Sequence, residues 1–238
     1  MTELLDLAIA AHGGWDRWQQ VSRVAARASL GGGVWALKGQ TDAPDVLITA
    51  ALHTQHVEFW PFKGVGQRGI YEPVRTTIET ADGRMLESRP NPRASFAGHQ
   101  LATPWDDLQL LYFRGYAAWT YLTTPFLLKG QGFKTQEGER WFENGEEWRR
   151  LNVTFPPDVH SHSTKQVFYF DVGGLLRRHD YSVDIIGGSA SAHYVSEHKT
   201  FGGLVFPTKR RVYRYGADNR PLFDRVSVAI DFHEISAE

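Results

Sequence analysis

The chain has 238 residues, 42% hydrophobic and 22% charged, and its formal net charge is −1. This composition is that of an ordinary globular protein, and the near-neutral charge gives no basic surface for nucleic acid. The chain contains no cysteine, which excludes disulfides, thiolate nucleophiles and cysteine-based metal sites. We expect one domain over residues 1–238, because no repeat or low-complexity linker divides the chain.

The first residues predict a short helical segment over residues 2–20. Thr2 suits the N-cap position, apolar residues follow at helical spacing, and Gly13 and Gly14 end the helix. This acidic, amphipathic start has neither the basic region nor the apolar core of a signal peptide. We therefore expect a cytoplasmic protein.

Residues 22–89 predict a series of strands. In the first strand, Val24, Ala26, Ala28 and Leu30 alternate with polar or small side chains. An Ala-Asp-Gly sequence later in this region is a good hairpin turn. The further strands that we expect are 34–39, 46–52, 53–62, 67–72, 75–80 and 84–89.

The strand pattern breaks at a Pro-Asn-Pro sequence, and residues 94–128 are expected to form a helical plug. The long helix in this segment, from Trp105 to Leu128, is apolar on nearly all sides. Such a helix is buried either in protein or in lipid. A membrane span needs about 20 consecutive apolar residues, and Arg114 and Pro125 interrupt the apolar stretch of this helix. We therefore expect the sheet to wrap around the helix, with no membrane span.

The last part of the chain, residues 133–235, predicts an antiparallel meander. A hairpin over 133–155 and a loop with His160 and His162 come first, and strands separated by glycine turns follow. Short turns return each strand beside the one before it, and a long meander tends to curl so that its edges are hidden. The strands expected here are 166–171, 175–185, 190–200, 204–215 and 222–235, with the last turn at 216–219.

Two motifs in this meander resemble sequences of the lipoprotein-carrier family, the LolA, LolB and LppX-like proteins. Residues 170–177 (FDVGGLLR) resemble the family's aspartate–glycine turn, and residues 202–208 (GGLVFPT) resemble its glycine-to-proline strand start. The resemblance implies a β-rich α+β fold. A single, strongly curved antiparallel sheet would form an unclosed barrel, plugged by a long apolar helix, with a short N-terminal helix.

The function of the resembled family is expected to carry over less well than its fold. Proteins of that family are exported, whereas this chain shows no signal sequence, and no set of residues identifies a lipoprotein cargo. Aromatic residues make up 13% of the chain, which favours a pocket for an apolar molecule. We expect a small apolar or amphipathic ligand between the sheet and the long helix, without a cofactor or a metal.

The candidate ligand-binding residues come mainly from the long helix. Helical spacing places Tyr112, Tyr116 and Trp119 on one stripe of this helix. The buried hydroxyl and indole groups on such a stripe need hydrogen-bond partners, which a ligand pocket can supply. The residues expected to line the pocket are Phe113, Tyr116, Trp119 and Tyr181, with Trp60 near the rim and Arg114 or His179 at a polar end.

Two alternatives remain open from the sequence. A cofactor-free lyase, isomerase or hydrolase would use His179 as a general acid or base, because strand parity places it on the buried face with Tyr181. No nucleophile elbow, phosphate loop, dinucleotide fingerprint or zinc-protease motif is present. Alternatively, the exposed edges of a half-open barrel would pair with a partner chain. His160 and His162 lack a third metal ligand and are expected to be solvated.

Overall fold

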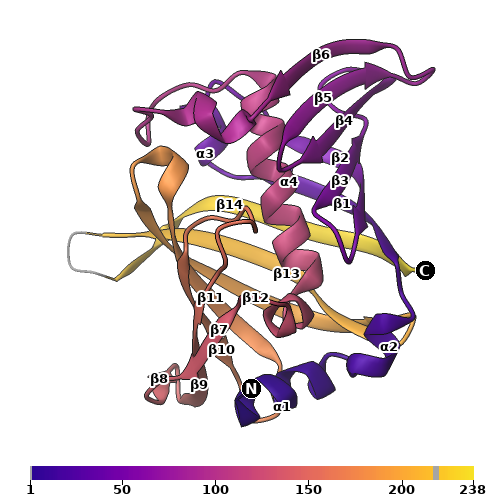
Figure 1. Cartoon of the computed structure of the whole chain (residues 1–238). Helices are drawn as coiled ribbons and strands as arrows, with labels where there is room; N and C mark the ends of the chain where they lie inside the picture. The colour runs from indigo at the N-terminus through magenta and orange to yellow at the C-terminus, as the bar shows by residue number, and fades with distance from the viewer. Residues whose placement is uncertain (1, 217–219) are drawn as a thin grey trace.

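A single antiparallel sheet of 14 strands dominates the computed structural model, which describes residues 2–216 and 220–238 (Figure 1). The strand order is β6-β5-β4-β3-β2-β1-β14-β13-β12-β11-β10-β9-β7, and β8 pairs with β9. The strands are β1 Arg23–Gly31, β2 Ala43–Ala51, β3 His56–Trp60, β4 Gln67–Glu72, β5 Arg75–Thr80, β6 Met85–Pro90, β7 Lys134–Glu137, β8 Trp141–Glu143, β9 Glu146–Thr154, β10 Lys165–Phe170, β11 Leu176–Val183, β12 Ser189–Phe201, β13 Leu204–Tyr215 and β14 Pro221–Ala237.

The helices lie on the concave side and at one end of this sheet (Figure 1). The long helix α4 runs along the concave side, and α1 and α2 cover the lower end as drawn. The helices are α1 Glu3–Ala11, α2 Trp15–Gln19, α3 Val34–Leu37 and α4 Asp107–Thr123, with the 3₁₀ helices η1 Pro92–Phe96, η2 Phe126–Lys129 and η3 Asp184–Ile186.

The sheet curls around α4 but does not close. The last strand β14 returns beside β1, so the N-terminal strands and the C-terminal meander form one continuous surface. The strands β6 and β7 remain as its two ends. This architecture confirms the expected fold class, an unclosed antiparallel barrel with a long helix inside it.

The helix α4 begins with a capping box and is buried along its length. The Asp106 side chain accepts a hydrogen bond from the backbone N–H of Gln109, whose side chain in turn accepts one from the backbone N–H of Asp106. Every residue from Leu108 to Thr123 is buried. The helix packs against β2 to β6, and its other side faces the meander.

A glycine permits the close approach of α4 to the sheet. A Cβ atom at Gly115 would lie 2.1 Å from Cγ of Tyr71 in β4. Glycine normally weakens a helix interior, by about 1 kcal/mol relative to alanine. Its presence here is explained by the Tyr71 ring, which occupies the space of the missing side chain.

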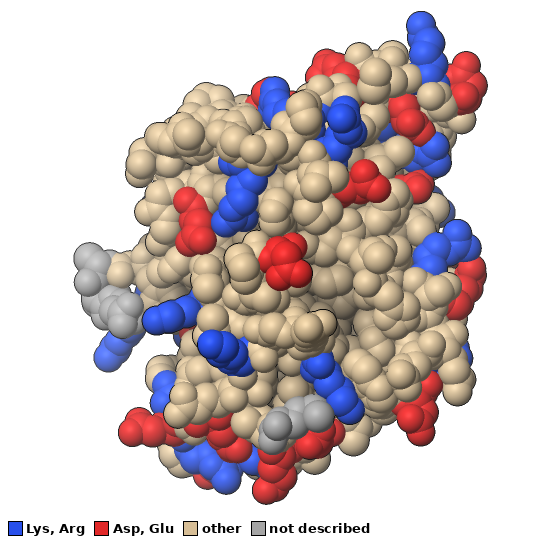
Figure 2. Space-filling model, viewed as in Figure 1, with Lys and Arg blue, Asp and Glu red and all other residues tan. Residues whose placement is uncertain are grey.

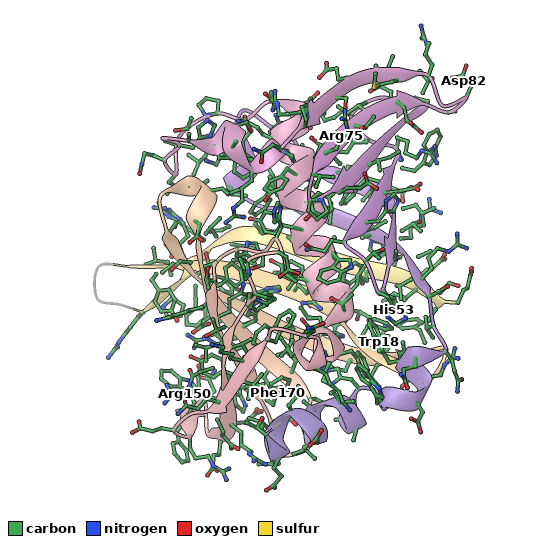
Figure 3. The ribbon with its side chains drawn as sticks, in the orientation of Figure 1. Trp18, His53, Arg75, Asp82, Arg150 and Phe170 are labelled. Atoms are coloured by element: carbon green, nitrogen blue, oxygen red, sulfur yellow. The ribbon has the colours of Figure 1, made fainter. Side chains whose placement is uncertain are left out.

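The lower end of the barrel is filled by aromatic packing. Trp18 of α2 stacks on Phe126 of η2, with 4.4 Å between the ring centroids and 4° between the planes. The Trp18 ring also contacts the imidazole of His53 edge to face, with 5.8 Å between the ring centroids. Figure 3 labels Trp18 and His53 at this end of the barrel. Trp18 of α2 thus packs against η2, the segment that follows α4.

Two expected elements differ from the structure. Residues 34–39 were predicted to be a strand, which is wrong, because Val34–Leu37 form α3. Val34 and Trp35 are adjacent and both buried, so the segment lacks the alternation of a strand, and the Lys38 backbone N–H closes a helical turn on Val34. The long helix ends at Thr123 rather than Leu128, because Pro125 cannot continue the hydrogen-bond pattern, and η2 follows.

The described surface is mixed in charge. Figure 2 shows basic and acidic side chains interspersed over the visible face, without a large area of one sign.

Among the described residues, no helix is both long enough and apolar enough to cross a membrane. The expected turn at 216–219 falls mostly on residues 217–219, which lie outside the described residues.

Candidate functional site

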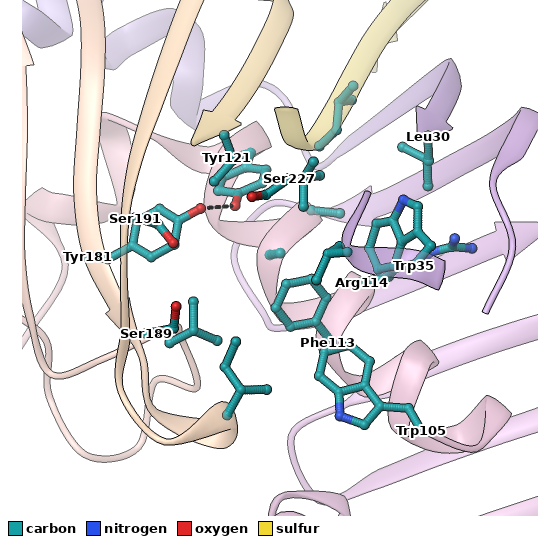
Figure 4. Close-up of a pocket in the computed structure, with 18 of the residues that line it drawn as sticks. Leu30, Trp35, Trp105, Phe113, Arg114, Tyr121, Tyr181, Ser189, Ser191 and Ser227 are labelled. Atoms are coloured by element: carbon teal, nitrogen blue, oxygen red, sulfur yellow. Dashed lines mark hydrogen bonds between the residues drawn. The ribbon is translucent and has the colours of Figure 1, made fainter. Parts of the chain in front are cut away.

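An apolar slot lies between α4 and the concave face of the meander (Figure 4). Its walls come from α3, α4, the loop before α4 and strands β1 to β3 and β11 to β14. The lining residues are Leu30, Val34, Trp35, Ile48, Phe59, Leu101, Trp105, Phe113, Arg114, Ala117, Ala118, Tyr121, Tyr181, Val183, Ile186, Ser189, Ser191, Val212, Arg214, Ser227, Val228, Ile230 and Phe232.

The slot is narrow in this conformation. The cavity between its walls has a volume of about 60 Å³. This volume holds only a few water molecules. A larger apolar molecule must displace side chains or move α4 away from the meander.

One wall of the slot carries a buried cation. The guanidinium of Arg114 lies 4.7 Å from the ring centroid of Trp35, and its Nη2 donates a hydrogen bond to the backbone oxygen of Thr41 at 3.1 Å. Burial lowers the pKa of Arg114 to about 10, while Asp42 and Asp107 act in the opposite direction. Arg114 therefore remains charged at neutral pH beneath the indole that covers it.

The opposite wall ends in a small hydrogen-bonded group of aromatic side chains. The hydroxyl of Tyr121 lies 3.0 Å from the hydroxyl of Tyr181 and 2.8 Å from Nε2 of His162, and Figure 4 shows the first of these bonds. Nδ1 of His162 lies 3.2 Å from the hydroxyl of Tyr116. Burial lowers the pKa of His162 to about 3, so its ring is neutral, with one nitrogen donating and the other accepting.

Three of the predicted ligand-binding residues line the slot. Phe113 and Arg114 face it from α4, and Tyr181 faces it from β11. Figure 4 shows Tyr181 across the slot from Phe113 and Arg114. The structure therefore brings these three side chains together around one space, and their role in ligand binding stays a prediction.

Three other predicted residues lie behind the slot wall rather than on it. Tyr116 bonds to His162, and the indole N–H of Trp119 donates to the backbone oxygen of Ala51 at 2.9 Å. His179 stacks on Phe168 at 4.0 Å between centroids, and its Nε2 lies 2.6 Å from Oε1 of Gln166. These contacts give each polar group a partner within the protein.

The alternative of a histidine-dependent enzyme finds little geometric support at His179. The side chain is 1% exposed and does not line the slot. Burial holds the pKa of His179 well below its usual value. A general acid or base must reach the reacting proton, and His179 is not among the side chains that line the slot.

Trp60 lies on the outer face of the sheet, away from the slot. In β3, Val57 and Phe59 are buried inside the barrel, so the alternation of the strand turns Trp60 outward. Its side chain, 37% exposed, lines a shallow groove with Leu47 and Arg27. The expected position at the pocket rim is therefore not what the structure shows.

The loop before β10 contributes residues that sequence reasoning missed. His162 is fully buried, and Nδ1 of His160 lies 2.9 Å from the hydroxyl of Tyr112. Both histidines were expected to be solvated, which is wrong for His162. The available signal was the row of tyrosines on α4, because their buried hydroxyls require partners from another segment. Among the described residues, no group of three or more side chains could hold a metal ion.

The chain is similar to known proteins in structure but not in sequence. No protein-family model and no curated protein matches the chain. A LolA superfamily protein from Nitrosomonas europaea is 9% identical and has a TM-score of 0.55, with 99% of this chain and 92% of that chain covered. A DUF1329 family protein from Desulfovibrio piger is 11% identical, with a TM-score of 0.54 and the same coverage.

A third structure is a provisionally described outer membrane lipoprotein-sorting protein domain from Vibrio parahaemolyticus. It is 10% identical, with a TM-score of 0.55, and the match covers 99% of this chain and 91% of that chain. Sorting of outer membrane lipoproteins takes place outside the cytoplasm. This likeness contradicts the cytoplasmic location expected from the N-terminus.

Identities of 9 to 11% establish the fold and not the activity. The matches extend over nearly the whole of this chain and more than nine tenths of each of the other chains. The chain has a LolA-like fold.

Proposed function

We propose that the protein binds one small hydrophobic or amphipathic molecule in the slot between α4 and the meander. The observation that carries this proposal is the chemistry of the slot wall, which is apolar along most of its surface. The polar groups are Arg114, the Tyr121–Tyr181 pair, the indole N–H groups of Trp35 and Trp105, three serines and Arg214. Ligand pockets in proteins have this character, an apolar lining with few polar groups that fix orientation.

The arrangement of α4 allows the slot to widen. The helix packs against β2 to β6, and most of the slot lies between α4 and β11 to β14, although Ile48 of β2 and Phe59 of β3 also line it. Ala117 and Ala118 present only methyl groups to the slot. A ligand would therefore separate the helix from the meander without breaking the packing that holds α4 to the N-terminal strands.

The similarity in fold supports a role in holding or carrying a hydrophobic molecule. One of the similar structures is described as a lipoprotein-sorting domain. We propose the coarser role for this chain, the carriage of a lipid-like molecule, since no residue identifies a lipoprotein cargo. The ligand would leave water for a surface of aromatic and aliphatic side chains, which is favourable by about 25 cal/mol for each Å² of apolar area buried.

Fluorescence titration with N-phenyl-1-naphthylamine tests the proposal, because this neutral apolar probe brightens when it leaves water. The protein should bind one probe molecule per chain. Ala118→Phe should fill the slot and weaken binding at least about tenfold, a loss of roughly 1.4 kcal/mol. Ala10→Phe, on the exposed side of α1, is the matched control and should leave binding unchanged. Absence of binding, or equal binding by Ala118→Phe and the wild type, would refute the proposal.

A further inference from the structure

A buried arginine without a carboxylate partner lies just beyond the slot. Arg210 of β13 is 2% exposed, and its Nη2 donates to the backbone oxygen of Tyr121 at 2.9 Å. Within residues 2–216 and 220–238, its Nε has no hydrogen-bond partner and no acidic side chain forms an ion pair with it. Burial of an unpaired cation is costly, so its retention calls for an explanation.

Arg178 shows what a buried arginine with a full set of partners looks like in the same sheet. This residue, on β11, is also 2% exposed. Its guanidinium donates to both carboxylate oxygens of Asp180, at 2.7 and 2.8 Å, and to Glu143 at 2.8 Å. Further bonds go to the hydroxyls of Tyr194 and Tyr215. Arg210 has none of these anionic partners.

The surroundings of Arg210 contain neutral imidazoles with unused nitrogens. Both ring nitrogens of His193 lack a partner among the described residues, and its ring lies 4.6 Å from that of Tyr121. Nε2 of His12 and Nε2 of His198 are also buried and unpartnered, and these two rings are 6.2 Å apart. We call Arg210, His193, His12 and His198 the Arg210 cluster.

The charge of the Arg210 cluster is positive. Burial lowers the pKa of His12 and His198 to about 4 and holds that of His193 well below its usual value, and Arg210 lowers all three further. The imidazoles are therefore neutral at pH 7. His193, with both ring nitrogens unpartnered among the described residues, can donate one N–H to an anion, whereas His12 already donates its Nδ1–H to the backbone oxygen of Ala8 at 2.8 Å. Arg210 itself stays charged, since burial lowers its pKa only to about 10.

The Arg210 cluster continues the slot along two neighbouring strands. Ser191 and Val212 line the slot, and His193 and Arg210 lie two residues further along β12 and β13. Side chains two apart in a strand share a face and are separated by about 7 Å. Tyr121 stands between the slot and the cluster. Its hydroxyl bonds to Tyr181 at the slot, and its backbone oxygen accepts a hydrogen bond from Arg210.

We propose that the Arg210 cluster binds the carboxylate of a long-chain fatty acid whose hydrocarbon chain occupies the slot. This inference rests on the proposed function and adds the chemistry of the ligand's head. A carboxylate matches the planar guanidinium with two parallel hydrogen bonds and needs less room than a phosphodiester. The Tyr121 ring would have to move aside, which opens the path from slot to cluster.

Arg114 fits the role of head-group anchor less well, although it lines the slot. Its charge is offset by Asp42 and Asp107. An aromatic ring covers both guanidinium groups, Trp35 over Arg114 at 4.7 Å and Tyr121 over Arg210 at 5.0 Å, so the acidic neighbours make the difference. Arg210 has no such acidic neighbour. Arg210 is already buried away from water in the ligand-free protein. A charge-assisted hydrogen bond between Arg210 and the carboxylate would therefore form without further desolvation of the cation.

Titration with cis-parinaric acid and with its methyl ester, followed by the fluorescence of the polyene chain, tests this inference. The wild type should bind the acid at least about tenfold more tightly than the ester, as expected for charge-assisted hydrogen bonds to a buried partner. Arg210→Met should bring the acid to the affinity of the ester and leave ester binding unchanged. Arg211→Met is the matched control, because Arg211 lies on the same strand and pairs with Asp231 outside the barrel.

The outcomes separate the two proposals. Equal binding of acid and ester by the wild type, a comparison that needs no variant, would overturn the Arg210 inference and leave the proposed function standing. A preference that survives in Arg210→Met, or that is lost in Arg114→Met instead, would also overturn it. Displacement of the acid by 20 mM acetate alone would mean a small-anion site and refute a fatty-acid site. Failure of both probes to bind would refute both proposals.

Discussion

The imidazole of His162 stacks on the ring of Tyr181, with 3.9 Å between the centroids and 4° between the planes. The same imidazole is hydrogen-bonded to Tyr116 and Tyr121 of α4. A residue of the loop before β10 therefore joins the central helix to β11 at the wall of the slot.

Acid should destabilise the protein through His162. The folded state holds its pKa at about 3, whereas the unfolded chain has a pKa near 6.5, so the unfolded state binds more protons between these values. The stabilisation is complete above about pH 6.5 and declines as the pH falls toward 3. Between pH 6 and pH 4 the free energy of unfolding of His162→Gln should fall less steeply than that of the wild type. The two slopes should differ by up to about 1.4 kcal/mol per pH unit.

Urea denaturation at several pH values measures this difference in slope. The other buried histidines, such as His12 and His193, titrate in both proteins and so cancel in the comparison. His233→Gln, at an exposed position, is the control and should keep the slope of the wild type. Parallel slopes for His162→Gln and the wild type would show that His162 is not held neutral.

Trp119→Ala should unfold the protein more than it weakens ligand binding. The indole is 6% exposed, bonds to Ala51 and does not line the slot, so truncation leaves a cavity and an unpaired carbonyl. Such losses cost about 3–5 kcal/mol, which is a fall in melting temperature of roughly 10 °C in a domain of this size. Trp119→Phe should retain most of the packing. Loss of probe binding at an unchanged melting temperature would instead place Trp119 at the ligand.

Gly115→Ala should destabilise the protein although alanine favours helices. The added Cβ would lie 2.1 Å from the Tyr71 side chain, so α4 or β4 must shift. We expect a cost of about 1–3 kcal/mol, typical of overpacking, measured by thermal unfolding. At Gly33, whose nearest contact would be 3.6 Å away, the same substitution should be neutral or slightly stabilising. Equal effects at the two glycines would contradict the close packing of α4.

Substitution of the two buried arginines should change the stability of the ligand-free protein differently: loss of Arg178 should lower it, and loss of Arg210 should not. Arg178→Met leaves Asp180 and Glu143 without their cation and should cost about 3–5 kcal/mol. Arg210→Met removes an unpaired buried charge and should leave the free energy of unfolding unchanged or raise it. Chemical denaturation without added lipid provides the comparison. A large loss of stability in Arg210→Met would reveal a structural partner for this cation.

The strands of the meander were predictable because their boundaries are marked locally. The glycine turns and the alternation of apolar side chains placed 204–215 as a strand, and β13 spans the same residues. The same alternation, applied to β3, would have turned Trp60 away from Phe59 and out of the barrel. The strand prediction for residues 34–39 was wrong because a single helical turn is too short to show a helical period in the sequence.

The site was less predictable because its polar contacts join segments far apart in the chain. His162 and Tyr121 are 41 residues apart, and their hydrogen bond depends on how a loop folds over α4. Likewise, nothing local marks Arg210 as unpaired, since Lys209 and Arg211 on the same strand both have acidic partners outside the barrel. Sequence patterns showed which faces are buried but not which buried polar groups lack a partner.

Photocrosslinking tests most directly whether the slot is the ligand-binding site. A palmitate analogue with a diazirine in its chain would be bound, irradiated and located by mass spectrometry of the digested protein. We predict labels within Phe113–Tyr121 of α4 and within Tyr181–Ser191 of the meander, both of which line the slot. Labels concentrated in the outer groove around Trp60 and Leu47, with none on α4, would contradict the account.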